Sequence, residues 1–179
     1  MDLSRIPAGK NPPWDVNVVV EVPMGSDPVK YEIDKDSGAL FVDRFLHTAM
    51  HYPCDYGFIP HTSADDGDPV DVCIPNKVPV AAGAVVRVRP VGVLIMEDEE
   101  GQDEKIIAVP PTKLCPDFKH VYSLDDIKGF TLQRIAHFFQ HYKDLEENKW
   151  VQVDRWGDHN EAARMIETAL NGDVQKLAS

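Results

Sequence analysis

The chain has 179 residues, 43% of them hydrophobic, which is enough for one well-packed domain and too short to favour two. Thirty acidic residues against eighteen basic ones give a net charge of -12, which disfavours binding to nucleic acid or to an anionic membrane. The three cysteines show no CxxC spacing, so we expect reduced thiols rather than a disulfide framework or a zinc knuckle.

The N-terminus has no apolar core of the kind that a secretory signal needs, and no run approaches 18 consecutive apolar residues. No repeat, low-complexity tract or Ser/Gly linker divides the chain. We therefore expect a single soluble, cytoplasmic domain over residues 1–179.

Short runs rich in β-branched residues recur before residue 120, between turn-forming prolines and glycines. They are VNVVVEVP (16–23), VKYEID (29–34), ALFVDRF (39–45), VDVCIP (70–75), AVVRVRPVGVLIM (84–96) and KIIAVP (105–110). Their length and the fourteen prolines predict a strongly curved antiparallel sheet or a small barrel.

After residue 120 the apolar period changes from two to about 3.6. Residues 131–147 predict an amphipathic helix whose apolar face is formed by Leu132, Ile135, Ala136, Phe139, Tyr142 and Leu145. A second helix is expected from about Asn160 to Leu170, ending at an Asn171-Gly172 cap, and KWVQVDRW between the two helices favours one more strand. The fold class is α+β, a β-barrel with two helices laid against it.

Several polar residues interrupt the strand patterns. Glu21 stands in an apolar run, where a carboxylate needs solvent or a cationic partner. Lys30 and Glu32 share one face of their strand, and strict alternation puts Arg44 opposite Asp43. A solvated outer face explains each of these residues singly, so only the group as a whole indicates a functional site.

Residues 50–62, MHYPCDYGFIPHT, place Tyr52, Tyr56 and Phe58 among prolines and a glycine. Aromatic residues in such a turn-rich segment commonly cap a core. A tyrosine hydroxyl can also donate a hydrogen bond to an anion without adding charge.

The stretch DDGDPVDV places Asp65, Asp66, Asp68 and Asp71 within seven positions. It can be a solvated turn, since Asp and Gly are common turn formers. It does not match an EF-hand, which has acidic residues at alternate positions before its glycine and a Glu six residues later. It fits a divalent metal site, because carboxylates without nearby His or Cys select Mg²⁺ or Mn²⁺ over zinc or copper.

A second acidic group, EDEEGQDEK (97–105), lies between two predicted strands and can add ligands from Asp98, Glu99 and Asp103, although a solvated hairpin loop also explains it. These carboxylates are accompanied by basic residues, namely Lys30, Arg44, Lys105 and Lys143. Carboxylates alone would suit a cation store, whereas interleaved cations indicate an anionic ligand bridged by metals. Phosphate is the natural candidate.

The strings DGDPVDV, VKYEID, GALFVDRF, YPCDYGFIP, RPVGVL and IAHFFQHYKDLE resemble the soluble family I inorganic pyrophosphatases, most of all their bacterial members. The resemblance runs from about residue 3 to about residue 170. It implies a distorted five-stranded antiparallel barrel of the OB type with flanking C-terminal helices, a need for Mg²⁺, and homohexamers built as dimers of trimers.

The resemblance also implies roles for individual residues. Metal ligands are implied at Asp66, Asp71 and Asp103, with Asp98 and Asp68 also in the metal shell. Pyrophosphate and phosphate contacts are implied for Lys30, Arg44, Tyr56, Lys105, Tyr142 and Lys143, and Glu21, Glu32, Tyr52 and Glu99 match positions that line the same cavity. Asp65 matches no family role and is expected to be a turn residue.

The implied reaction is hydrolysis of pyrophosphate to two phosphates. By removing pyrophosphate, it drives the biosynthetic reactions that release pyrophosphate. In the mechanism that the resemblance implies, two bound metals would lower the pKa of the attacking water. Asp68 is the candidate base, and Lys30, Arg44 and Tyr56 are among the groups that stabilise the leaving phosphate. No covalent intermediate is expected.

His137 and His141 lie four residues apart on one face of the predicted helix, a spacing that can bind a metal. They lack the glutamate of HExxH, and the family resemblance implies a contact between the subunits of two trimers instead. Assembly would then weaken as the pH falls through the range in which histidines titrate, about 6.5.

Two other classes of function are open to such a chain. An OB-type module for oligonucleotides or sugars is disfavoured by the net charge and by the lack of an aromatic stacking stripe. The chain could also be a passive divalent-cation binder, and an assay of phosphate release from pyrophosphate would distinguish such a protein from an enzyme. Among enzymes, nucleoside triphosphates are less favoured substrates because the chain has no GxxxxGK[ST] loop.

Overall fold

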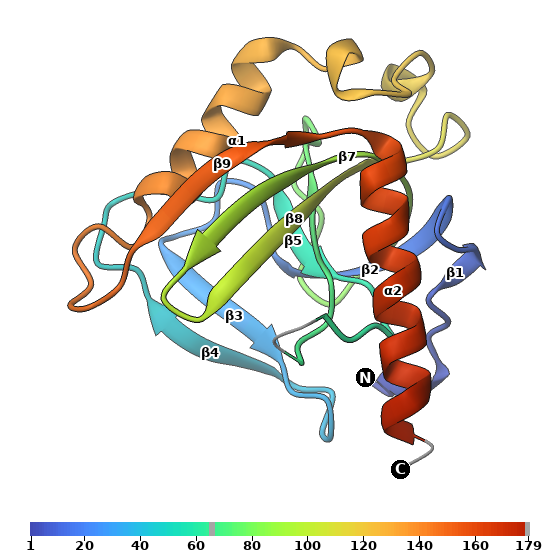
Figure 1. Ribbon diagram of the computed structural model, residues 1–179, viewed down its shortest axis with the longest axis horizontal. Coiled ribbons are helices and arrows are strands. Elements are labelled where there is room, and N and C mark those ends of the chain that lie inside the picture. Colours follow the sequence, from blue (N-terminus) through green and yellow to red (C-terminus); the bar gives the residue numbers. More distant parts are fainter. Residues whose placement is uncertain (65–66, 178–179) are drawn as a thin grey trace.

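Five strands close into a ring in the computed structural model, which describes residues 1–64 and 67–177 and side chains as far as residue 172 (Figure 1). The hydrogen-bonded order around the ring is β2 (Asp15–Val22), β5 (Asp55–Phe58), β6 (Asp71–Ile74), β8 (Gly101–Val109) and β7 (Val85–Asp98), and β7 pairs back with β2. The predicted five-stranded barrel is thus confirmed.

One pairing differs from the antiparallel arrangement that the sequence predicts. Strands β6 and β8 run parallel, with Asp71 opposite Lys105. The connection after β6 carries the chain to β7, which pairs with β2 across the ring, and β8 returns from β7 through a hairpin into the place beside β6. Closure of the ring therefore requires this parallel pair.

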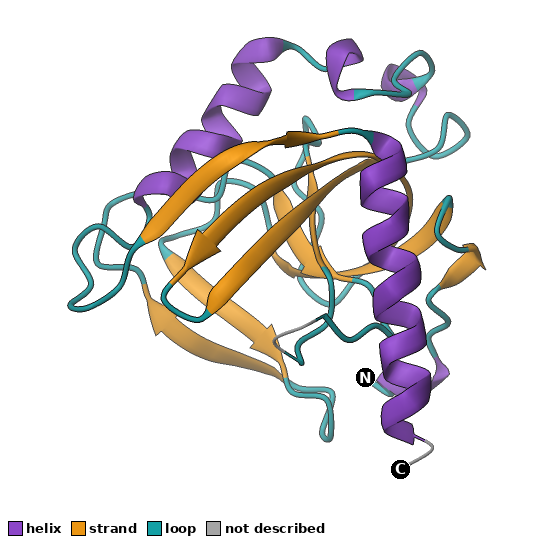
Figure 2. Ribbon diagram, in the orientation of Figure 1, coloured by secondary structure: helices purple, strands orange, loops and turns teal. Residues whose placement is uncertain are grey.

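Further strands extend the barrel or lie beside it. β1 (Gly9–Asn11) pairs with β2, and β9 (Val151–Gly157) pairs with β7. β3 (Val29–Ile33) and β4 (Leu40–Phe45) form a separate hairpin, visible below the main sheet in Figure 2. All six predicted runs contain strands and KWVQVDRW contains β9, whereas β1 and β5 were not predicted as strands.

Strand β5 lies in the segment that its prolines and glycine marked as turns. All four of its residues are buried, and Gly57 faces the backbone of β2. A Cβ atom at Gly57 would lie 2.0 Å from the carbonyl oxygen of Val19. This glycine therefore permits a close approach of two strands and does not mark a turn.

The helices are α1 (Gly129–His141) and α2 (His159–Leu177), with 3-10 turns η1 (Leu3–Arg5), η2 (Pro116–Phe118) and η3 (Leu124–Asp126). Helix α1 ends earlier than predicted, and Leu145, placed on its apolar face by the sequence, is exposed. The predicted cap at Asn171-Gly172 is wrong, because α2 continues through it. A Cβ atom at Gly172 would lie 3.0 Å from the carbonyl oxygen of Ser63, so this glycine lets the helix approach a loop.

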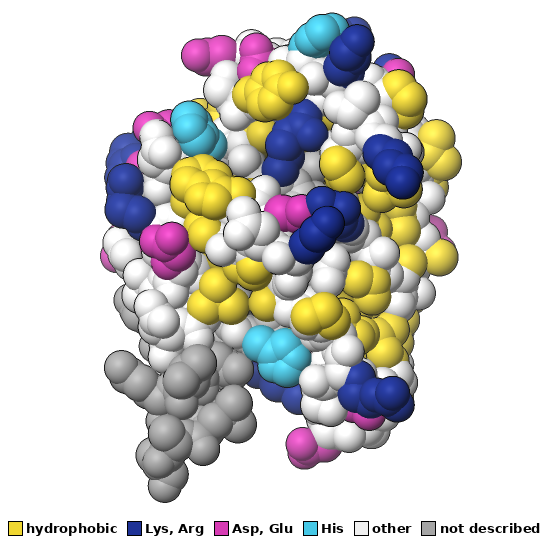
Figure 3. All heavy atoms as spheres, turned by 90° about the vertical axis from the view of Figure 1, so that its right-hand side faces the viewer, with side chains coloured by type: hydrophobic (Ala, Val, Ile, Leu, Met, Phe, Trp, Pro, Cys, Tyr) yellow, Lys and Arg dark blue, Asp and Glu magenta, His cyan; other side chains and the backbone are white. Residues whose placement is uncertain are grey.

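Each helix covers its own part of the hydrophobic core. Ile135, Phe138 and Phe139 of α1 pack with residues of β5 and β7, and Ala162 and Ile166 of α2 pack with residues of β6, β7 and β8. On the side of the molecule formed by α2 and β1, hydrophobic side chains are interspersed with charged ones (Figure 3). No helix of the described residues is long and apolar enough to cross a membrane.

Candidate functional site

One polar cavity of about 330 Å³ collects most of the predicted site residues. Of those residues, the cavity is lined by Glu21, Lys30, Glu32, Arg44, Tyr52, Tyr56, Asp68, Asp71, Asp98, Asp103, Lys105, Tyr142 and Lys143. Glu99 is not among the lining residues and contacts two of them, Lys143 and Lys149. Asp66, predicted as a metal ligand, and Asp65, predicted as a turn residue, lie outside the described residues.

The parallel pairing of β6 with β8 builds the centre of this cavity. It places Asp71 opposite Lys105, and Asp103 two residues before Lys105 on the same face of β8. The Lys105 ammonium donates to Asp71 Oδ2 at 2.5 Å and also to Asp103 Oδ1. The Tyr56 hydroxyl donates to the same oxygen of Asp71. One buried cation thus holds two carboxylates together.

At this centre the single positive charge of Lys105 faces two carboxylates, Asp71 and Asp103. Burial opposes ionisation of Lys105, but Asp71 and Asp103 outweigh it and raise the lysine pKa well above its usual value. Burial and the nearby charge of Asp71 raise the pKa of Asp103 despite its contact with Lys105. One ammonium therefore does not fully neutralise the local carboxylates, and the centre favours further positive charge.

The hairpin turn between β7 and β8 supplies a second cluster. The Lys143 ammonium, from the segment after α1, donates to Asp98 Oδ2 at 2.7 Å and to Glu99 Oε1 at 3.1 Å. Lys149 lies 2.8 Å from Glu99 Oε1. Burial raises the pKa of Glu99, but hydrogen bonds from Lys149 and Lys143 outweigh it and lower that pKa to about 2. Glu99 therefore orients two lysines from outside the cavity.

The β3–β4 hairpin forms the opposite wall and corrects one prediction. A bulge interrupts the register after the pair Lys30 and Arg44, so that Tyr31 faces Val42 and Asp43 is the extra residue. Such a bulge redirects side chains. As a result, Asp43 and Arg44 both line the cavity, whereas strict alternation had placed them on opposite faces.

Lysine 30 is held by two acidic residues of this hairpin. Its ammonium lies 2.5 Å from Glu32 Oε1 and 3.4 Å from Asp43 Oδ2. Burial lowers the pKa of Lys30, but these carboxylates outweigh it and raise that pKa above its usual value. Lys30 therefore stays charged at the wall of the cavity.

Glu21 lines the cavity from a buried position, near enough to Lys30 for that charge to act on it. Its carboxyl group is buried, and Oε1 accepts a hydrogen bond from the backbone N–H of Ile33 at 2.7 Å. Burial, opposed by that hydrogen bond and reinforced by the charges of Asp71 and Glu32, raises its pKa to about 8. The metal-free protein therefore favours the protonated form of Glu21 at neutral pH.

Asp68 lies at the mouth of the cavity. Its side chain is 78% exposed, and Oδ1 lies 3.4 Å from the Lys35 ammonium. This position gives the carboxylate access to both the cavity and bulk water.

The acidic residues of the cavity fit a hard divalent cation. Among the described residues, no three side chains of His, Cys, Asp or Glu are close enough together to hold a metal ion as they stand. The carboxylates of Asp68, Asp71, Asp98 and Asp103 nevertheless line one cavity, and they offer oxygen donors alone. Such a donor set suits Mg²⁺.

Sequence reasoning missed several lining residues, among them Lys35, Asp43, Lys149 and Gln102. For Asp43 the signal was misleading because the bulge is set by strand pairing. Lys35 and Lys149 carry no pattern that separates them from ordinary surface lysines.

Comparisons with known proteins agree with this geometry. Residues 18–172 match the model of a family described as "Inorganic pyrophosphatase". The chain is 61% identical over 174 residues to the inorganic pyrophosphatase of Rhodospirillum rubrum, covering 97% of each chain. It is 56% identical over 164 residues to that of Salmonella typhimurium, covering 92% of this chain and 93% of the relative.

Solved structures show the same similarity. A structure described as an inorganic phosphatase from Anaplasma phagocytophilum has a TM-score of 0.92 at 51% identity, covering 94% of this chain and 99% of that one. The inorganic pyrophosphatase from Thermus thermophilus has a TM-score of 0.91 at 41% identity, with coverage of 97% and 99%.

Proposed function

The chain belongs to the inorganic pyrophosphatase family and is an inorganic diphosphatase, and we propose that it hydrolyses pyrophosphate in the cavity described above with the help of Mg²⁺. The observation that carries the proposal is the mixture of charges in one cavity. Five aspartates and six basic residues line it together. Pyrophosphate bridged by metals needs both, because the metals require carboxylates and the phosphate oxygens require cations.

Asp71, Asp103, Asp98 and Asp68 would hold Mg²⁺, with Asp66 as a further ligand inferred from the family resemblance. When bound, Mg²⁺ neutralises substrate oxygens and lowers the pKa of the attacking water. Mn²⁺ has the same preference for oxygen donors and is a possible substitute.

The chain's own residues bind and orient the substrate in this proposal. Lys30, Arg44, Lys105 and Lys143 donate charge-assisted hydrogen bonds to phosphate oxygens. Tyr56 and Tyr142 add neutral donors, since burial is the main cause that raises the pKa of each hydroxyl and keeps it protonated. These groups stabilise the leaving phosphate as it gains charge.

Asp68 is the proposed base. Its exposed carboxylate at the cavity mouth can accept a proton from the attacking water and pass it to solvent. No covalent intermediate is needed, because the reaction requires only positioning and electrostatic stabilisation.

An assay of phosphate release from pyrophosphate, with and without Mg²⁺, tests the proposal. We expect Asp71→Asn to reduce the rate by at least about 100-fold, because the substitution removes a charged metal ligand while preserving side-chain volume. Glu97→Gln is the matched control, since Glu97 is an exposed acidic residue of β7. Undiminished activity of the folded Asp71→Asn protein, or Mg²⁺-independent turnover, would overturn the two-metal assignment.

We also propose that the protein is a cytoplasmic homohexamer. The free cysteines Cys54, Cys73 and Cys115 fit a reducing compartment. The exposed face of α1 offers a surface for self-association, where Phe130 is 71% exposed and the rings of His137 and His141 lie 4.7 Å apart.

A further inference from the structure

Glu146 is a largely buried acidic residue close to the cavity to which the sequence analysis gave no role. It lies in the segment between α1 and β9, and its side chain is only 9% exposed. Burying a carboxylate costs free energy unless a partner compensates it. The partner within reach is Arg44, whose Nε lies 3.7 Å from Glu146 Oε1.

Arg44 Nε and Glu146 Oε1 are both buried, and both lack a hydrogen-bond partner in the part of the chain that the structure describes. Among the buried side-chain atoms of the described residues, only Ser26 Oγ, Arg44 Nε and Glu146 Oε1 have no hydrogen-bond partner. Two of the three therefore face each other, one cationic and one anionic. The separation is within ion-pair range and beyond that of a hydrogen bond, so Glu146 acts on Arg44 chiefly through its charge.

Arg44 has two further contacts. The guanidinium carbon lies 5.7 Å from the centre of the Tyr142 ring, and Nε lies 4.0 Å from Asp43 Oδ2. A planar guanidinium that lies near a ring and has two carboxylates within ion-pair range of Nε keeps its two terminal nitrogens as a fork for an anion. Glu146 lies on the Nε side of that fork.

We propose that Glu146 is a positioning residue, which holds the Arg44 guanidinium so that its terminal nitrogens face a phosphate group in the cavity. This inference rests on the proposed pyrophosphatase function and extends it to a residue that does not line the cavity. A negative charge is required at this position, not only a side chain of the right volume.

The local backbone does not depend on Glu146. The carbonyl of Leu145 contacts His47 Nδ1 at 3.1 Å, and the carbonyl of Tyr142 accepts a hydrogen bond from the Thr48 hydroxyl at 3.5 Å. These bonds join the end of β4 to the segment after α1 without using the Glu146 side chain. Removing the carboxylate is therefore expected to free Arg44 and to leave both segments in place.

Steady-state kinetics with Mg²⁺ and pyrophosphate test this role. We expect Glu146→Ala to raise KM for pyrophosphate and the inhibition constant of phosphate about ten-fold, because a misplaced guanidinium binds phosphate less well. We expect kcat to fall as well, because in the proposed function Arg44 also stabilises the leaving phosphate as it gains charge. Glu146→Gln keeps the volume and loses the charge, so it should show most of the same increase, whereas Glu146→Asp should recover part of it.

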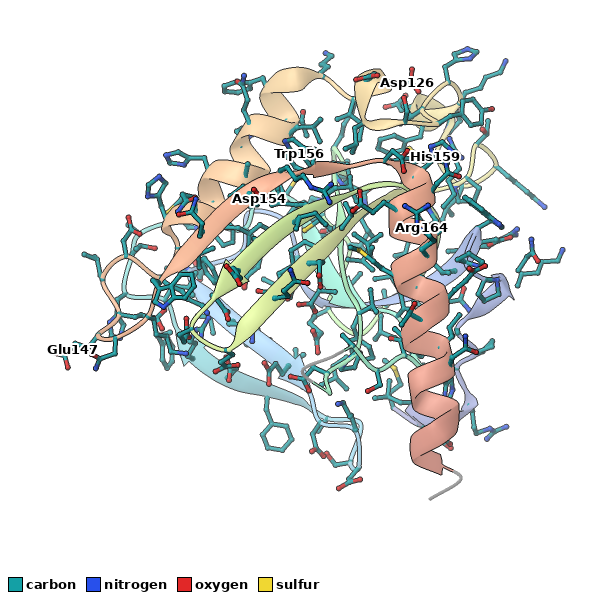
Figure 4. All side chains as sticks on the ribbon, viewed as in Figure 1. Asp126, Glu147, Asp154, Trp156, His159 and Arg164 are labelled. Atoms are coloured by element: carbon teal, nitrogen blue, oxygen red, sulfur yellow. The ribbon has the colours of Figure 1, made fainter. Side chains whose placement is uncertain are left out.

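Glu147 provides the matched control. It is the neighbouring glutamate, is exposed, and lies at the outer tip of the loop between α1 and β9, pointing away from the molecule (Figure 4). Glu147→Ala should leave KM, the phosphate inhibition constant and the unfolding temperature unchanged.

An Arg44→Ala background distinguishes positioning from a merely structural role. If Glu146 acts through Arg44, Glu146→Ala adds no further increase in KM there. Equal increases in both backgrounds, or kinetics of Glu146→Ala matching those of Glu147→Ala, would overturn the inference. Failure of the wild-type protein to release phosphate would instead refute the proposed function, so the two failures are distinguishable.

Discussion

A single buried carboxyl group makes the stability of the protein depend on pH. Glu21 is held in the fold with a pKa of about 8, compared with an ordinary value of 4.5. Between these two values the folded chain keeps a proton that the unfolded chain releases. The contribution of Glu21 to stability is therefore complete below pH 4.5 and is lost as the pH rises through 8.

Replacing Glu21 by Gln should remove this dependence, because the amide keeps the oxygen that accepts the Ile33 N–H but cannot ionise. We expect the two proteins to have similar free energies of unfolding near about pH 5, and the variant to be more stable by a few kcal/mol near about pH 9. Denaturant unfolding in metal-free buffer across this range measures the difference. A difference that stays constant with pH would show that Glu21 is ionised in the fold.

The residues of the site were more predictable than their contacts. Residue type and spacing marked many of the carboxylates, lysines and tyrosines, and the family resemblance completed the set; thirteen of the fifteen predicted site residues line the cavity. The ion pairs could not be predicted, because Lys105 with Asp71 and Lys143 with Asp98 depend on which strands meet. The bulge at Asp43 likewise depends on the pairing of β3 with β4.

At the scale of elements, β5 and β2 lie close together at Gly57. Gly57→Ala would place a methyl group against the Val19 carbonyl and push the two strands apart. We expect a loss of about 1–3 kcal/mol in the free energy of unfolding, the usual range for overpacking.

Gly129→Ala is the matched control, because a Cβ atom at this first residue of α1 would meet nothing within 4 Å. Its unfolding temperature should equal or slightly exceed that of the wild type, since alanine favours a helix. Equal stability of the two variants would mean that β2 and β5 adjust to the added methyl group without cost.

Elements with a strong period were predicted correctly, and short or fully buried ones were not. The alternating runs and the apolar stripe of α1 are set by local sequence. Strand β5 was missed because its glycine, which is typical of a turn, instead allows β5 to lie close to β2. The parallel pairing of β6 with β8 was missed because it follows from closure of the ring. Both depend on residues that are far away in the chain.

At the scale of the whole molecule, self-association through α1 is a prediction that sedimentation can test. Replacing both His137 and His141 by Ala should convert the assembly into smaller species, because the exposed pair lies on the proposed contact face. His120→Ala, at an exposed histidine between η2 and η3, is the control and should sediment as the wild type does. A hexamer that persists unchanged in the double variant would contradict the proposed interface.

The ring of strands has a consequence for synthesis of the protein. Its closing contact joins β2 to β7, and the cavity is completed only by Tyr142, Lys143 and Lys149 beyond α1. A nascent chain that has emerged only as far as β8 therefore carries most of the acidic residues of the site without the lysines that face Asp98 and Glu99. Activity should appear late, after most of the chain has left the ribosome, and not grow in proportion to its length.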